Sequence, residues 1–78
     1  MPRLTVALRL IRLREKAQWS QRELERRAQL SLGLVSRIER GLVLPSASTV
    51  LKIATALGVP VCVLYPSPHQ EEEHAHAS

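Results

Sequence analysis

Apolar residues at helical spacing begin close to the start of the chain. Between residues 5 and 17 an apolar residue recurs every three or four positions, which predicts a helix with one buried face. That face consists of Val6, Leu10, Leu13 and Ala17. Thr5 is placed to cap the start of this helix, and Leu8 falls on the opposite side, where we expect it to be exposed.

The clearest amphipathic pattern lies between Ser46 and Gly58. Its apolar face consists of Val50, Ile53, Ala54 and Leu57. Ser46 can cap the start of this helix, and Gly58 suits its end because glycine accepts the left-handed backbone found there. The apolar segment over residues 60–66 is too short for a strand without a partner, so we expect a single helical turn.

Two short helices are predicted between these longer ones. Ser20 and Glu23 have the spacing of a capping box, which starts a helix near Gln21. Ser31 can cap a second helix that begins near Leu32. Only residues around 29–31 remain to connect the two, which favours a helix, a tight turn and a helix over a long loop.

The second short helix has two different faces. Val35 and Ile38 lie on the side suited to a core. The other stripe consists of Gly33, Ser36, Arg37 and Arg40. Such a stripe is often only a solvated face, but after two caps and a tight turn it favours a polar partner, namely the major groove of DNA.

Composition agrees with one small helical domain. The chain has 78 residues and 45% apolar residues, with Trp19 and Tyr65 as its aromatic side chains, so the core must be aliphatic. We expect the domain to span residues 1–65 and residues 66–78 to be a disordered tail rich in His and Glu. The tail histidines are His69, His74 and His76. A tail lacks the fixed geometry of a metal site, so we expect no metal and no other cofactor.

The charge is unevenly distributed. The net charge is +4, yet all 11 basic residues lie at or before Lys52, and three of the 7 acidic residues are Glu71, Glu72 and Glu73. Residues 1–68 therefore carry +7, from 11 basic against 4 acidic residues. This excess favours a polyanion such as double-stranded DNA, although charge alone leaves acidic protein or membrane surfaces open.

Several other classes of protein are disfavoured. Cys62 is the single cysteine, so it forms no internal disulfide, and we expect it to be a small buried hydrophobe. No apolar run approaches the roughly 20 residues of a membrane span, and arginines interrupt the apolar residues near the N-terminus, which disfavours a signal peptide. We therefore expect a cytoplasmic protein. We find no convincing pair of nucleophile and base, so we do not expect an enzyme.

With these motifs in place, the chain resembles the lambda-repressor-like (Cro/repressor, XRE-type) helix-turn-helix family over roughly residues 5–65. The matching segments are LRLIRLRE (8–15), WSQREL (19–24), LS (30–31), VSRIERG (35–41), PS (45–46) and TVLKIATALGV (49–59). The resemblance implies a compact all-α domain of five helices, whose third helix reads the major groove, commonly as a two-fold dimer. It thus implies a sequence-specific transcriptional regulator of the repressor or controller type.

The resemblance also implies roles for individual residues. The base-reading positions fall on Leu32, Gly33, Ser36 and Arg37. Gln21 is implied to contact a phosphate, and Arg40 lies nearer the DNA backbone. A structural ion pair between the first and third helices falls on Arg14 and Glu39. Because Leu32 and Gly33 offer no side-chain hydrogen bonds, direct readout depends mainly on Arg37, with Ser36 assisting.

Two residues depart from the family pattern. Glu25 stands where a small residue is usual, and we expect its carboxylate to reach Arg37 or Arg40. Gln29 stands where glycine is usual, so it must accept a left-handed backbone or the turn must differ.

An apolar surface leaves a second function open. The loop and the C-terminal segment together offer Leu42, Val43, Leu44, Val61 and Val63. We expect these residues to form a homodimer interface, because a monomer of this size would bind DNA weakly. The alternative is a module that binds a partner protein, such as the antitoxin of a toxin pair.

Overall fold

The computed structural model describes residues 2–65 as an all-helical domain. Its helices are α1 (Pro2–Lys16), α2 (Gln21–Ala28), α3 (Leu34–Glu39), α4 (Ala47–Leu57) and α5 (Val61–Leu64). No strand is present within this range, so the prediction of an all-α domain with five helices is confirmed. The expected tail and its histidines lie outside the described residues.

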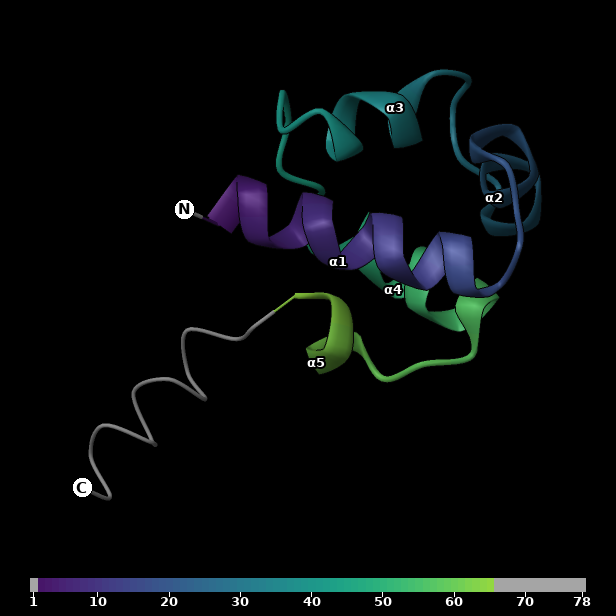
Figure 1. Cartoon of the computed structure of the whole chain (residues 1–78). Helices are drawn as coiled ribbons and strands as arrows, with labels where there is room; N and C mark the ends of the chain where they lie inside the picture. Colours follow the sequence, from purple (N-terminus) through teal and green to yellow (C-terminus); the bar gives the residue numbers. More distant parts are fainter. Residues whose placement is uncertain (1, 66–78) are drawn as a thin grey trace.

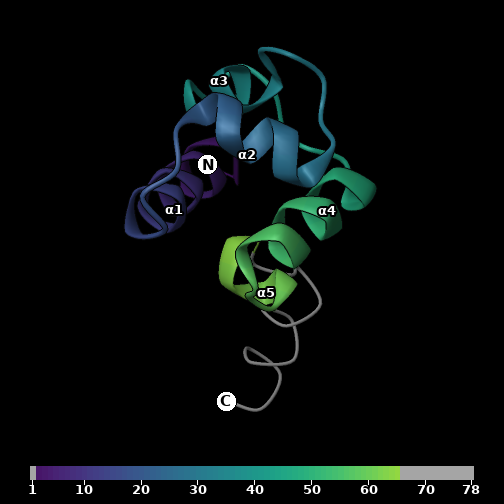
Figure 2. The same cartoon turned by 90° about the vertical axis from the view of Figure 1, so that its right-hand side faces the viewer.

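Helix α1 runs between two other helices. It contacts both α3 and α5, which lie on opposite sides of it (Figure 1). Helix α2 contacts α3 and α4, and α4 also contacts α5. The view turned by 90° shows α3 and α5 at opposite ends of the domain (Figure 2). The outer surfaces of α3 and α5 are therefore separated by the rest of the protein.

The core is aliphatic, as the composition predicts. Its buried members are Val6, Leu10, Leu24, Ala28, Val35, Ile38, Val50, Ile53 and Leu64. Trp19 and Tyr65 are partly buried and pack against this cluster from its edge. Every helix contributes at least one side chain, so the short helices α3 and α5 are held mainly by packing.

The first helix begins earlier than its apolar pattern indicates. Thr5 was expected to cap it, but α1 starts at Pro2 and Thr5 lies inside the helix. Proline is well suited to a first helical turn, because it lacks only an N–H that would have no partner within the helix. Leu8 is exposed, as expected.

The N-terminus of α2 has only one of the two hydrogen bonds of the predicted capping box. The Ser20 hydroxyl accepts a hydrogen bond from the Glu23 backbone N–H at 3.0 Å. The Glu23 carboxylate does not return to Ser20 but pairs with Arg26 and Arg27. Helix α2 ends at Ala28, and the next residue, Gln29, is its C-cap with a left-handed φ of 57°, the first of the two alternatives that the sequence left open.

Helix α3 begins two residues later than predicted. Ser31 does not cap it with its side chain; the N-cap is Gly33, with φ of 85°, and the helix begins at Leu34. Leu32 therefore belongs to the turn and not to the helix. The turn between α2 and α3 is correspondingly longer than the sequence pattern indicated.

The last two helices follow their predictions. The Ser46 hydroxyl accepts from the Thr49 N–H at 3.2 Å, and α4 ends at Leu57 with Gly58 as its C-cap, at φ of 72°. The segment after Pro60 forms the expected single turn. Cys62 is exposed, so its predicted burial is wrong, because a single turn directs only Leu64 fully into the core. Over residues 2–65, no helix has the length and apolar character needed to cross a bilayer.

Candidate nucleic-acid interface

A nearly buried ion pair holds the inner side of α3. The two residues expected to pair, Arg14 and Glu39, meet through two hydrogen bonds, from Arg14 Nε at 2.7 Å and from a terminal guanidinium nitrogen at 3.1 Å. Their side chains are 15% and 5% exposed. The hydrogen bond to Glu39 raises the pKa of Arg14, so the guanidinium is held firmly in its charged form. This pair fixes the end of α3 against α1.

Two neighbours complete the surroundings of the pair. Arg14 also donates to the Trp19 carbonyl at 2.8 Å, which ties down the loop before α2. The Gln21 side-chain amide donates to Glu39 Oε1 at 2.8 Å. Gln21, the candidate phosphate contact, is thus anchored by one N–H while its amide nitrogen keeps a second. Helices α1, α2 and α3 meet at this cluster.

The outer side of α3 carries the candidate reading residues. Arg37 and Arg40 are exposed, and neither side chain makes a hydrogen bond or ion pair within residues 2–65. Ser36 is half-buried beside them, and Leu32, in the preceding turn, is 75% exposed. The structure therefore presents two uncommitted guanidinium groups on the side of α3 that points away from the core, one from Arg37 in the helix and one from Arg40, its C-cap.

Gly33 has a backbone role in addition to its position near the reading face. Its φ of 85° is strained for any residue with a Cβ, and it occupies the N-cap of α3. A Cβ added there would have no atom within 4 Å. The glycine is thus required by backbone conformation and not by a close neighbour.

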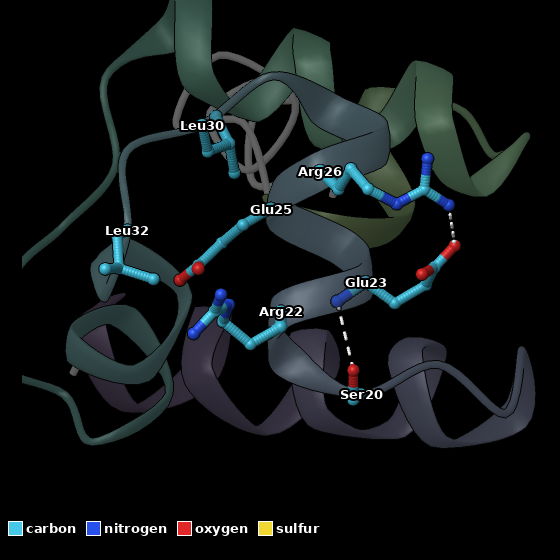
Figure 3. A pocket seen from close by; sticks show the side chains of 7 residues that line it. All are labelled: Ser20, Arg22, Glu23, Glu25, Arg26, Leu30 and Leu32. Atoms are coloured by element: carbon cyan, nitrogen blue, oxygen red, sulfur yellow. Dashed lines mark hydrogen bonds and ion pairs between the residues drawn. The ribbon is translucent and has the colours of Figure 1, made fainter.

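Glu25 is placed differently from the expectation. Its carboxylate does not reach Arg37 or Arg40; Glu25 Oε2 accepts a hydrogen bond from the Val35 backbone N–H at 3.1 Å. The residue is only 5% exposed, because its side chain extends from α2 toward the beginning of α3 (Figure 3). The reading face consequently keeps its positive charge.

A recess lies between α2 and the turn before α3. It has a volume of about 370 Å³, and its lining residues are Ser20, Arg22, Glu23, Glu25, Arg26, Leu30 and Leu32 (Figure 3). Arg22 is exposed and extends from α2 toward the same side as Leu32. Arg22 is not among the residues predicted to contact DNA, although its place directly after Gln21 at the start of α2 was a usable signal.

The remaining arginines of α2 are committed to structure. Arg26 and Arg27 both donate to Glu23, and these hydrogen bonds, that from Arg26 first, lower the pKa of the Glu23 carboxyl. The Arg27 guanidinium also lies over the Trp19 ring, 4.5 Å from its centroid. Arg26 and Arg27 are therefore less available to a phosphate than Arg22.

The apolar surface around the loop and α5 is only partly as expected. Four of its members are exposed: Leu42, Leu44, Val61 and Val63. We call these four residues the apolar patch. Val43 is half-buried and packs against the core, so it offers less of its side chain to this surface than the other four residues do. A groove of about 280 Å³, lined by Pro45, Ala47, Val50, Val61 and Tyr65, joins the loop to α5.

Comparison with known proteins agrees with this geometry. A family model described as Helix-turn-helix matches residues 10–64. The crystal structure of the hypothetical transcription factor NHTF from Neisseria is similar to the chain, with a TM-score of 0.81 and 31% sequence identity. The match covers 95% of this chain and 85% of that one. No curated protein matches the sequence.

Proposed function

Because the chain belongs to the helix-turn-helix family of DNA-binding regulators, we propose that it is a sequence-specific transcriptional regulator that places α3 in the major groove. The observation that carries the proposal is the outward face of α3, where Arg37 and Arg40 are exposed and uncommitted within residues 2–65. The inner face of the same helix is fixed by packing and by Glu39. A rigidly held helix with free guanidinium groups suits recognition of a groove edge.

Base readout in this proposal depends mainly on Arg37. A guanidinium can hold the O6 and N7 atoms of guanine through two hydrogen bonds, which is worth about 1–3 kcal/mol of discrimination. Ser36 assists with its hydroxyl, and exposed Leu32 offers an apolar contact for a thymine methyl group. Gly33 contributes no side chain, so few positions of the site are read directly, and we expect modest specificity.

Phosphate contacts position the helix without reading sequence. We assign them to Gln21, Arg40 and Arg22, of which the last comes from the structure alone. Gln21 can donate its second amide N–H to a phosphate while the first remains on Glu39. Contacts of this kind fix the orientation of the protein on the duplex and make its affinity fall with rising salt.

In this proposal the protein binds a two-fold operator as a homodimer. The apolar patch offers the surface for pairing, and its members are exposed on the loop and on α5. We prefer a second copy over an unrelated partner such as a toxin, because a single α3 reads too few bases for tight binding. The proposed action is occupancy of an operator in the cytoplasm, by repression or control of transcription, without a catalytic step.

Two arginine substitutions test the proposal. A preferred duplex is first selected by the unaltered protein from a random-sequence pool, and affinities are then measured for it and for a scrambled duplex. We expect Arg37→Ala to reduce the preference between them by about 5-fold to 150-fold, because one bidentate contact is lost. Arg40→Ala should weaken both duplexes similarly.

The matched control is Arg12→Ala, an exposed arginine on α1 that makes no hydrogen bond within residues 2–65. It should alter neither the preference nor the affinity by more than about 2-fold. An unchanged preference in Arg37→Ala would contradict the assignment of the reading residue. Failure of the unaltered protein to select any duplex would contradict the proposed function itself.

A further inference from the structure

The beginning of α3 lacks the usual local cap. Its N-cap residue is Gly33, which has no side chain, and the Ser31 hydroxyl does not bond to the helix. The Ser31 backbone carbonyl accepts from the Leu34 N–H at 3.2 Å. The next amide, that of Val35, therefore needs an acceptor from elsewhere, because it is buried inside the domain.

Glu25 supplies that acceptor from another helix. Its Oε2 lies 3.1 Å from the Val35 nitrogen, which is the second amide of α3. The carboxylate thus makes the bond that a serine or aspartate N-cap would normally make to its own helix. A negative group is also favoured at this end of a helix by the alignment of the backbone dipoles.

The backbone of the same residue holds the other end of the turn. The Glu25 carbonyl accepts a hydrogen bond from the Leu30 N–H at 2.8 Å, just after α2 ends. Glu25 therefore bonds to the chain both where it leaves α2 and where it enters α3. The turn between these points contains two residues with positive φ, Gln29 and Gly33. Glu25 of α2 therefore holds both ends of this turn.

Helix α3 then has a polar anchor near each end. Glu39 holds its last residue against Arg14, and Glu25 holds its first turn against α2. The helix spans only Leu34–Glu39, so a small movement of its first turn changes the direction of the whole helix. Arg37 lies between the two anchors and moves with the helix.

We propose that Glu25 is a positioning residue that sets the direction of α3, and through it the register of Arg37 on the base edges. The proposal rests on the proposed function and adds a specificity determinant that does not touch DNA. Direct readout depends on the placement of the guanidinium more strictly than phosphate contact does, because a bidentate hydrogen bond requires both distance and angle. Loss of the Glu25 bond therefore reduces sequence preference more than total affinity.

The test separates the hydrogen bond from the charge. Glu25→Asp keeps the negative charge but shortens the side chain by one methylene, so the carboxylate no longer reaches Val35. Glu25→Gln removes the charge but keeps an acceptor oxygen at nearly the same place. The readout is the ratio of affinities for the selected and the scrambled duplex, which does not depend on the fraction of protein that is folded.

We expect Glu25→Asp to lower this ratio by at least about 5-fold, because a misdirected Arg37 loses part of a bidentate contact worth about 1–3 kcal/mol. Glu25→Gln should retain the ratio within about 2-fold, although both of its affinities rise because a negative charge near the DNA is removed. The amide proton of Val35 should exchange with solvent faster in Glu25→Asp and at the original rate in Glu25→Gln.

An unchanged ratio in Glu25→Asp would overturn the proposal, and so would a ratio that falls in Glu25→Gln as far as in Glu25→Asp. Absence of any preference in the unaltered protein would overturn the proposed function instead. In that event the exchange rate of the Val35 amide still decides whether Glu25 holds α3.

Discussion

Replacing Arg14 with methionine should severely destabilise the domain. The substitution removes the three hydrogen bonds that the guanidinium donates, two to Glu39 and one to the Trp19 carbonyl. Glu39, whose side chain is 5% exposed, would keep only the amide of Gln21. Stranding a buried charge in this way costs about 3–5 kcal/mol, a large part of the roughly 5–15 kcal/mol that stabilises a typical domain.

Unfolding by urea, followed by tryptophan fluorescence, measures this loss. Trp19 is the single tryptophan and packs against the core, so its emission reports the global transition. We expect the free energy of unfolding of Arg14→Met to fall by about 3–5 kcal/mol and its Tm by more than about 10 °C. The double variant Arg14→Met with Glu39→Leu should recover most of the stability, because no charge is then left without its partner.

The control is Arg12→Met, two residues away on an exposed part of α1. It should change stability by less than about 0.5 kcal/mol. The reasoning would be refuted if Arg14→Met cost under about 1 kcal/mol, as an exposed ion pair does, or if the double variant were no more stable than the single one.

Three further predictions concern other parts of the molecule. The pKa of Glu23 is lowered, chiefly by a hydrogen bond from Arg26, so its contribution to stability is present above its ordinary value of 4.5 and is lost as the pH falls through the folded-state value. Glu23→Gln should therefore flatten the acid side of a stability profile measured by circular dichroism, and an unaltered slope would contradict this. Gly33→Ala should lower the free energy of unfolding by about 1–2 kcal/mol through backbone strain alone, and a calorimetric loss above about 3 kcal/mol would indicate a clash that the structure lacks. Val63→Asp should convert paired copies to folded monomers in sedimentation, whereas Val43→Asp should lower the stability of the fold itself, because Val43 is half-buried and packs against the core. Monomers before any substitution, with a different protein bound at the apolar patch, would favour the alternative of a partner-binding module.

Features fixed by neighbouring residues could be predicted from the sequence. Ser20 and Ser46 each bond to an amide three residues later, and Gly58 ends α4 with the backbone that glycine favours. The recurrence of apolar residues every three or four positions likewise indicated which faces of α1 and α4 are buried. Such interactions depend on spacing along the chain, which the sequence displays directly.

Features that depend on distant residues could not be predicted in this way. The start of α3 was misplaced because Glu25, ten positions before Val35, supplies the cap that Ser31 was expected to supply. Val43 is half-buried and packs against the core although it stands between two exposed leucines, since only the packing of the loop decides which side chain turns inward. The position of Arg22 directly after Gln21 could be seen in the sequence, but the direction of its side chain comes from the structure alone.

The place of α1 between α3 and α5 has a consequence for the spacing of the operator. If two copies pair through α5, the packed helices of both copies lie between the two reading helices, with no flexible linker. The distance and the angle between the two reading helices are then fixed by the protein and do not adjust to the DNA. Inserting one base pair between the half-sites would turn one of them by about a tenth of a helical turn, and the protein could not follow it.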